Sequence, residues 1–308
     1  MKLFLAGGEG VRFPVVLHAL GYPYRLCSYY YLRDNAQACA TILDAARDGS
    51  EWTMDSGLFS LMFGSDKGTL STFDDFRSYA LKYLEDVNSW GWKHAIVECD
   101  VQKLLGVKET EKLRDEIFRP SGREVIYVWH LPEGEDGLRR LARNEKRIAL
   151  SVPELRNVYG TGSNKLKTAL IRLLAIIKDE GNPRVHLLGN TQSSLVTLPA
   201  DSGDSTSWLA GGRYGTGYTY DVARRKVETV SVYSPRWRAW RAWCGKHYAK
   251  TFSLLNEVFQ PGTMAGVYYI NACCSAIAFL TTMGALGGER GATPPDILHV
   301  RPPSTIDE

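Results

Sequence analysis

The chain has 308 residues, of which 44% are hydrophobic, 23% charged and 11% aromatic, and its formal net charge is +3. This composition excludes an intrinsically disordered chain and is sufficient for two ordinary domains, or for one α/β barrel of about 250 residues with additions. A charge this close to zero does not by itself indicate a nucleic-acid partner, so the distribution of the basic residues matters more than their sum.

The cysteines and the N-terminus predict a cytoplasmic setting without a membrane. The six cysteines lie mostly in apolar runs and lack the density of a disulfide scaffold. Met1-Lys2 leads into a short apolar strand with no signal-peptide cleavage site. Residues 264–286 are uncharged and near the length of a membrane span, but they include Asn271 and have no basic cluster close by. We therefore expect a buried helix there, with a membrane span as the alternative.

Short apolar runs alternate with helical patterns along most of the chain. The predicted strands cover residues 2–6, 25–32, 51–54, 94–100, 124–130, 147–152, 185–189 and 195–198. The predicted helices cover residues 11–20, 35–48, a segment after Ser71-Thr72, 111–118, 135–144 and 164–178. This alternation is typical of parallel βαβ units, whose buried strands read as continuous apolar runs. The sequence therefore predicts an α/β fold, a (β/α)8 TIM-like barrel, with a doubly wound open sheet as the alternative.

The predicted domain organisation is a barrel with a helical extension. We expect the catalytic barrel to span residues 1–235 and the C-terminal helices, residues 236–308, to pack on it in the same compact unit. A helix is predicted to begin at Pro235, because proline after a residue such as Ser234 is common at the first helical position.

Six predicted strands have an acidic residue, a histidine or a glycine at their carboxyl end. These residues are Asp55, Asp100, His130, Glu154, Gly189 and Asp204. In a (β/α)8 barrel the catalytic groups gather at this end, so we expect these residues to converge on one mouth. The alternative interpretation is that strand ends meet loops, and loops are polar.

Four segments resemble motifs of the tRNA-guanine transglycosylase superfamily. Residues 55–59 read Asp-Ser-Gly-Leu-Phe, similar to the family's Asp-Ser-Gly-Gly-Phe. Residues 148–154 resemble Gly-Gly-Leu-Ala-Val-Gly-Glu, and residues 186–189 resemble His-Tyr-Leu-Met-Gly. Residues 201–204 read Asp-Ser-Gly-Asp, where the family has Asp-Met-Phe-Asp. The motifs follow the family's order, and each falls at a predicted strand end. Three positions depart from the family: Leu58 and Pro153 replace glycine, and Ser60 replaces glutamine.

The resemblance implies a base-exchange glycosyltransferase in which Asp204 is the nucleophile and Asp55 is the proton shuttle. The short chain is most similar to phage and bacterial relatives that act on DNA and replace guanine by a 7-deazaguanine, such as 7-cyano-7-deazaguanine. The expected substrate-binding residues are Ser56, Gly57, Asp100, His130, Glu154, Gly189, Ser205 and Thr206. Among them Asp100 suits a guanine edge, because a carboxylate accepts two donors in one plane. The alternatives are that residues 55–57 form only a turn and that Ser205 and Thr206 cap a helix.

Residues 223–250 interleave basic and aromatic side chains, a pattern that favours nucleic-acid contact. The expected contacts are Arg224, Arg225, Lys226, Arg236 and Arg238, with Arg213 steadying the phosphate of a flipped-out nucleotide. The alternative is that the tryptophans at positions 237, 240 and 243 dock a helix on the barrel while the arginines are solvated.

The chemistry requires no cofactor, and the family's zinc motif, Cys-x-Cys-x-x-Cys, is absent. Cys244, His247, Cys273 and Cys274 form an alternative ligand set, but adjacent cysteines on one helix point in different directions, so structural zinc is not favoured. The expected partners are DNA and a free 7-deazaguanine base, with tRNA as the alternative substrate and a homodimer left open. The expected location is cytoplasmic, in the host if the protein is phage-encoded. A non-catalytic nucleic-acid-binding barrel and a nucleoside hydrolase are the rival functions.

Overall fold

The computed structural model describes residues 1–7, 9, 13–63, 68–190, 196–221 and 223–287. Its contacts group the chain into two compact units. The first unit consists of Met1–Val11 and Pro23–Ser205, and the second of Arg12–Tyr22 and Thr206–Glu308. The segment 206–235, assigned to the barrel from the sequence, thus groups with the C-terminal helices.

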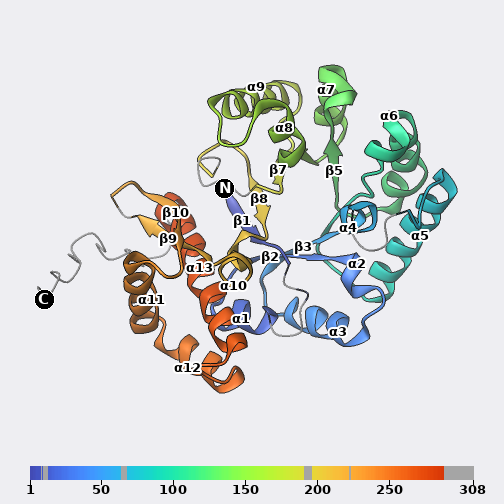
Figure 1. Ribbon diagram of the computed structural model, residues 1–308. Helices are drawn as coiled ribbons and strands as arrows, with labels where there is room; N and C mark the ends of the chain where they lie inside the picture. Colours follow the sequence, from blue (N-terminus) through green and yellow to red (C-terminus); the bar gives the residue numbers. More distant parts are fainter. Residues whose placement is uncertain (8, 10–12, 64–67, 191–195, 222, 288–308) are drawn as a thin grey trace, which may run out of the picture. The chain divides into compact units, whose positions relative to one another are not determined.

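The first unit contains eight parallel strands that close into a barrel (Figure 1). They are β1 (Lys2–Leu5), β2 (Tyr24–Ser28), β3 (Glu51–Asp55), β4 (Ala95–Val97), β5 (Val125–Trp129), β6 (Arg147–Ser151), β7 (Arg184–Leu188) and β8 (Ser202–Ser205). Closure is made by β1 and β8, which pair from Lys2↔Ser202 to Leu5↔Ser205. The predicted (β/α)8 barrel is confirmed, and the open sheet is excluded.

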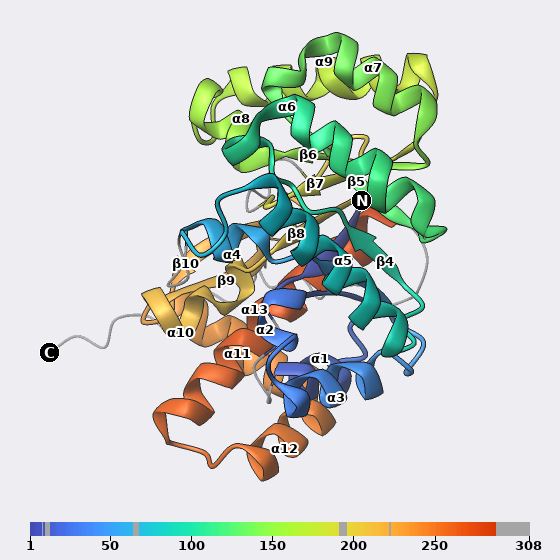
Figure 2. The same ribbon diagram turned by 90° about the vertical axis from the view of Figure 1, so that its right-hand side faces the viewer.

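Helices of the first unit lie outside these strands (Figures 1 and 2). They are α2 (Tyr29–Leu32), α3 (Ala36–Ala45), α4 (Leu58–Phe63), α5 (Phe73–Ser89), α6 (Gln102–Leu113), α7 (Gly134–Asn144), α8 (Val152–Tyr159) and α9 (Asn164–Glu180). A π-helical segment, η1 (Arg114–Phe118), continues α6, and the short 3-10 turns η2 (Arg119–Ser121) and η3 (Leu131–Glu133) flank β5. The predicted start of α5 is confirmed, because Thr72 and Asp75 form a capping box.

Side chains alternate along the strands between two apolar layers. Ala95, Val97, Ile126, Val128 and Ala149 pack together on one side of β4, β5 and β6. Their neighbours in sequence belong to the larger core that also contains the apolar faces of the helices. This period of two is what a barrel requires, because successive strand residues face its interior and its helical shell in turn.

Two predicted strands were wrong in extent or position. The run 25–32 is a strand only to Ser28, and its last four residues form α2. Tyr29 is buried there and donates its hydroxyl to Asp86 Oδ2 at 2.7 Å, which favours the turn into the helical layer. Residues 196–198 form a turn, and the eighth strand is β8 itself. Asp204 therefore lies within a strand.

The second unit consists mainly of helices around a two-stranded antiparallel sheet. Its elements are α1 (Phe13–Ala19), η5 (Ser207–Leu209), α10 (Ala210–Tyr214), β9 (Thr216–Asp221), β10 (Lys226–Ser231), α11 (Pro235–His247), α12 (Ala249–Val258) and α13 (Met264–Gly287). The predicted start of α11 is confirmed by Ser234, whose side chain accepts from the Trp237 N–H. Trp237 and Trp240 are buried, as expected of residues that dock this helix, and Trp243 stacks on Trp240.

Helix α13 passes a length-and-composition test for a membrane span over Met264–Gly284, with a mean hydropathy of 1.4. However, 61% of its apolar window is buried inside the protein. Core helices of water-soluble proteins have this same combination of features, so the helix is weak evidence for a membrane. The predicted buried helix agrees with this observation.

Candidate active site at the barrel mouth

Asp204 is held in β8 by groups from β7 and its following turn. Its carboxylate Oδ1 accepts the Gly189 N–H at 2.8 Å and lies 3.2 Å from His186 Nε2. The other ring nitrogen of His186 lies 2.8 Å from the Ser202 hydroxyl, which fixes the ring. Both contacts engage Oδ1, so among the described residues Oδ2 is the oxygen suited to attack an electrophile. Asp204 is only 9% exposed, so its carboxylate is also shielded from bulk water.

Gly189 reaches Asp204 because it is a glycine. Its φ of +62° lies in the left-handed region, and a Cβ there would stand 2.7 Å from Pro153 Cγ. A side chain at this position would therefore push the backbone away from Asp204. Pro153, which departs from the family motif, is thus the residue against which this turn packs.

Asp55 ends β3 and is stabilised by the turn that follows. Its Oδ1 accepts the Gly57 N–H at 2.6 Å, and Gly57 has a φ of +73°. Burial raises the pKa of Asp55 to about 6, against the opposing effect of the Gly57 N–H, and the charges of Asp204 and Asp100 add to the rise. Asp55 and Asp204 thus lie within electrostatic reach of each other, and Asp55 can exchange a proton near neutral pH.

Ser56 is buried behind Asp55, and its carbonyl accepts the Tyr79 hydroxyl at 2.6 Å. Asp55 is the last residue of β3, residues 56 and 57 connect it to α4, and the Gly57 N–H closes this connection on the Asp55 carboxyl, whose pKa is raised. The interpretations of residues 55–57 as a chain connection and as part of a site are compatible.

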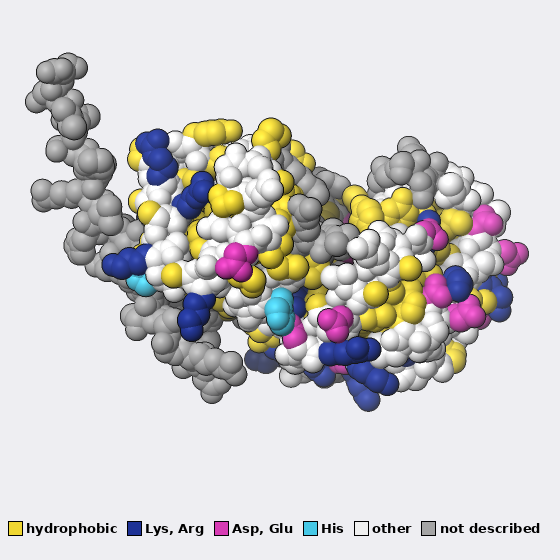
Figure 3. Space-filling model, turned by 90° about the horizontal axis from the view of Figure 1, so that it is seen from below, with side chains coloured by type: hydrophobic (Ala, Val, Ile, Leu, Met, Phe, Trp, Pro, Cys, Tyr) yellow, Lys and Arg dark blue, Asp and Glu magenta, His cyan; other side chains and the backbone are white. Residues whose placement is uncertain are grey.

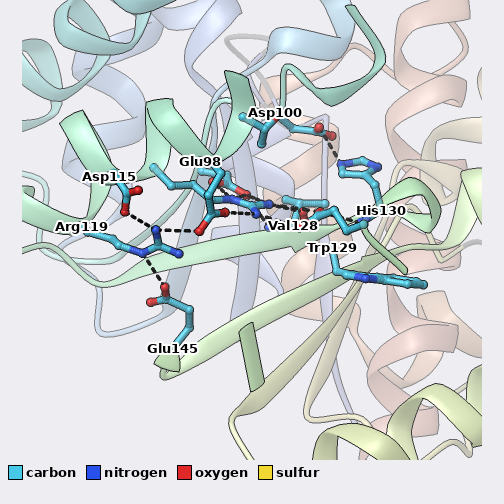
Figure 4. Close-up of polar contacts among 12 residues, drawn as sticks. Glu98, Asp100, Asp115, Arg119, Val128, Trp129, His130 and Glu145 are labelled. Atoms are coloured by element: carbon cyan, nitrogen blue, oxygen red, sulfur yellow. Dashed lines mark hydrogen bonds and ion pairs between the residues drawn. The ribbon is translucent and has the colours of Figure 1, made fainter. Parts of the chain in front are cut away.

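Asp100, His130 and Glu154 form one chain of polar contacts across the ends of β4, β5 and β6. His130 Nε2 lies 2.6 Å from Asp100 Oδ1, and its Nδ1 lies 2.7 Å from Glu154 Oε2. Figure 4 shows the Asp100 carboxylate directed at the imidazole ring. The sequence predicted that these three residues converge, and the structure brings them together.

The charge of His130 follows from these contacts. Burial disfavours the protonated ring, but the hydrogen bonds and charges of Asp100 and Glu154 outweigh it and raise the pKa of His130 to about 10. Each carboxylate can only accept, so both ring nitrogens carry protons. With both nitrogens engaged, His130 orients the two carboxylates, and Asp100 Oδ2 and Glu154 Oε1, which do not contact the ring, can accept from a ligand.

Glu9 is a further carboxyl near Asp55 that sequence reasoning missed. It follows β1, is buried, and its Oε1 accepts the Ser28 N–H at 2.5 Å. Burial raises the pKa of Glu9 to about 7, with the charge of Asp55 adding to the effect. Its position after a strand and a glycine was the available signal, because a carboxyl at a strand end is what singled out Asp55. His186 was missed as an orienting residue because it lies inside a strand.

The remaining predicted site residues differ in where they lie. Ser205 is buried at the end of β8, whereas Thr206 is exposed and makes no side-chain cap for η5. The side chain of Arg213 lies outside the described residues. The other predicted nucleic-acid contacts belong to the second unit and are exposed: Arg224, Arg225, Lys226, Arg236 and Arg238.

Several of these cations are already paired. Arg236 contacts Asp221 at 3.2 Å and Glu228 at 2.6 Å, and Arg224 and Lys226 also reach Glu228. On the face drawn in Figure 3, some lysine and arginine side chains lie alone, and others lie next to one another and to acidic side chains.

In the described part of the chain, no group of three or more His, Cys, Asp or Glu side chains is arranged to hold a metal ion. The cysteines of the alternative zinc set, Cys244, Cys273 and Cys274, are buried and free. His247 is exposed, and its Nδ1 lies 2.9 Å from the Trp243 carbonyl.

A scan of protein-family models and a search of curated proteins find no match to this chain. A functional assignment therefore rests on the residues and their geometry.

Proposed function

We propose that this protein is a base-exchange glycosyltransferase that replaces guanine in DNA by a 7-deazaguanine of the 7-cyano-7-deazaguanine kind. The observation that carries the proposal is the pair of carboxyls at the barrel mouth. Asp204 has one oxygen held by Gly189 and His186, and Asp55 has a pKa raised to about 6, mainly by burial and in part by the charge of Asp204. A retaining glycosidic exchange uses one carboxylate as the nucleophile and a second carboxyl as the acid and base.

In the first displacement, the Asp204 carboxylate attacks C1′ of the target nucleotide and forms an ester as the C1′–N9 bond breaks. Protonated Asp55 gives its proton to the leaving guanine. In the second displacement, ionised Asp55 takes the N9 proton of the incoming base, whose N9 attacks C1′ and releases Asp204. The two displacements retain the configuration at C1′ and return both carboxyls to their starting states.

Support for a guanine-like base comes from the acceptors around His130. Asp100 and Glu154 each accept from the cationic ring through one oxygen, and the second oxygen of each can accept from a ligand. A base with an N1–H and an exocyclic amine supplies the matching donors. In duplex DNA the target base must first leave the stack to reach such a mouth. No cofactor takes part in these steps, and the proposed setting is the cytoplasm, the host's if the protein is phage-encoded.

The test is base exchange by the purified full-length chain with labelled 7-cyano-7-deazaguanine. Duplex DNA and tRNA are offered separately to wild type, Asp204→Asn and Asp55→Asn. We expect label in DNA with wild type only, with losses of at least about a hundredfold in each variant, because removal of a general acid costs 10²–10⁴-fold.

Other outcomes discriminate among the rivals. Label in tRNA alone retains the mechanism and overturns the DNA substrate. Release of guanine without incorporation indicates a nucleoside hydrolase. Tight DNA binding by all three proteins, without label or release, contradicts the enzyme and favours a binding barrel.

A further inference from the structure

A buried arginine lies behind the Asp100–His130–Glu154 chain and is not used by the proposed chemistry. Arg114 is 0% exposed, and all five of its N–H donors have acceptors. Its partners are Glu98, Glu111, Glu133 and the carbonyl of Val128. Removing any of these charges from water is costly, so an arrangement this complete requires close geometry.

Two partners of Arg114, Glu98 and Glu133, also hold the segments that carry Asp100 and His130. Glu98 accepts from Arg114 at 2.9 Å and from the Val128 N–H at 2.7 Å, and it precedes Asp100 by two residues. Glu133 accepts from Arg114 at 2.9 Å and from the His130 N–H at 3.0 Å. One guanidinium therefore ties the end of β4, which carries Asp100, to the turn after β5, which carries His130.

The backbone at Arg114 departs from regular α-helix. Helix α6 changes at Arg114 into the π-helical segment η1. A π-turn shifts the side chains that follow relative to a regular helix, and such turns are frequent at functional sites. The guanidinium points into the ends of β4 and β5, where the six residues Glu98, Asp100, Arg114, His130, Glu133 and Glu154 combine four carboxylates with two cations.

We infer that Arg114 is a positioning residue that holds Asp100 and His130 in register for binding the free base. This inference rests on the proposed function for the identity of the ligand, but not for the effect on His130. Without the planar fork of the guanidinium, no single side chain binds both Glu98 and Glu133, so the two strand ends lose their shared partner and the contact between Asp100 Oδ1 and His130 Nε2 lengthens.

The chain offers a matched control in Arg119, five residues further on. Arg119 also binds carboxylates through a network, with Glu145 Oε1 at 2.8 Å and Asp115 Oδ1 at 2.5 Å (Figure 4). Its network shares Glu111 with Arg114, but among the described residues none of its partners contacts Asp100 or His130. Arg114→Lys and Arg119→Lys each keep the charge and remove the planar fork.

Three quantities are measured on the full chain: the His130 pKa by NMR of ¹⁵N-labelled imidazole, the Kd of 7-cyano-7-deazaguanine by calorimetry, and the Kd of duplex DNA. For Arg114→Lys we expect the His130 pKa to fall by at least about one unit, because it loses contact with Asp100. The Kd of the base is expected to rise about tenfold or more, since displacements of ~1 Å far from the chemistry can cost a hundredfold. The Kd of DNA is expected to stay within about twofold, and Arg119→Lys is expected to leave all three near wild type.

Unchanged His130 titration and base affinity in folded Arg114→Lys would overturn the inference, as would equal effects in Arg119→Lys. If Arg114→Lys does not fold, Glu133→Gln decides the question, because it weakens the same tie while keeping the side-chain size. A wild-type protein that binds no base, together with a lowered His130 pKa in Arg114→Lys, would refute the proposed ligand and retain the positioning role.

Discussion

His130 has a carboxylate at each ring nitrogen, and this arrangement sets how its charge affects stability. Its pKa in the folded protein is raised to about 10, above the ~6.5 of an unperturbed histidine. The folded state therefore binds a proton more tightly than the unfolded chain. The resulting stabilisation is fully present below pH ~6.5 and is lost as the pH rises through about 10.

We predict that His130→Gln lowers the free energy of unfolding more at pH 6.5 than at pH 9.5. The difference between the two pH values is expected to be at least about 1 kcal/mol, since one pKa unit corresponds to ~1.4 kcal/mol. Urea denaturation of wild type and variant at both pH values measures it. A gap that does not change with pH would show that His130 is not charged in the folded state.

Asp55 and Glu9 destabilise the fold when ionised, whereas protonated His130 stabilises it. Their pKa values are raised to about 6 and about 7, so the folded state disfavours their ionised forms. Both destabilise the fold increasingly as the pH rises from ~4 through these values. Comparing wild type with His130→Gln cancels this contribution, because both proteins contain the two carboxyls. Carboxyls that lower stability in this way are common at sites selected for chemistry.

The turn after β3 shows how one element depends on a glycine. A Cβ on Gly57 would lie 2.3 Å from Tyr30 Cβ and 2.5 Å from Ser28 Oγ, and its φ is +73°. Gly49 has a similar φ of +85°, but a Cβ there would meet nothing within 4 Å. The two positions separate the cost of the backbone conformation from the cost of the collision.

We predict that Gly49→Ala destabilises by about 1–2 kcal/mol, the cost of the left-handed conformation for a residue with a Cβ. Gly57→Ala is expected to cost at least ~1 kcal/mol more, since the clash with backbone and Cβ atoms forces a shift. It is also expected to reduce base exchange, because Gly57 donates to Asp55. Denaturation and exchange assays on both variants measure this, and equal stability of the two variants would contradict the role of the collision.

The sequence predicted seven of the barrel strands because their buried residues form apolar runs, as in Val125–Trp129. It missed β8, because the four residues Ser-Gly-Asp-Ser carry no apolar signal and their burial depends on neighbours such as His186. The carboxyls of the site were predictable as residues at strand ends. The roles of Glu9 and Arg114 were not, because they depend on contacts made between elements distant in sequence.

At the scale of the whole molecule, the proposed DNA contacts differ in how far their charge is already neutralised. Both Arg236 and Arg238, on the same helix, are exposed, but Arg236 is paired with Asp221 and Glu228, whereas Arg238 has no ion pair among the described residues. A cation that is already paired gains less from a phosphate, because it must give up its carboxylates.

We predict that Arg238→Ala reduces the slope of log K for DNA against log salt by about 0.9, the contribution of one phosphate contact. Arg236→Ala is expected to change the slope by less. Titrations with duplex DNA between about 50 and 200 mM salt give both slopes. A larger change for Arg236→Ala would contradict the ranking.

The closure of the barrel between its first and last strands also has a consequence during synthesis. Lys2 can pair with Ser202 only after the residues between them have been synthesised. Phe13, whose ring lies 5.4 Å from that of Trp208 and 5.6 Å from that of Tyr268, can contact these rings only later. At about 5–20 residues per second, a ribosome needs ~10–40 s to add the intervening 200 residues. For that time the emerging chain exposes one unpaired edge of β1, since β2 covers only the other, and an apolar helix. We therefore expect its yield in cells to depend on chaperones that cover both.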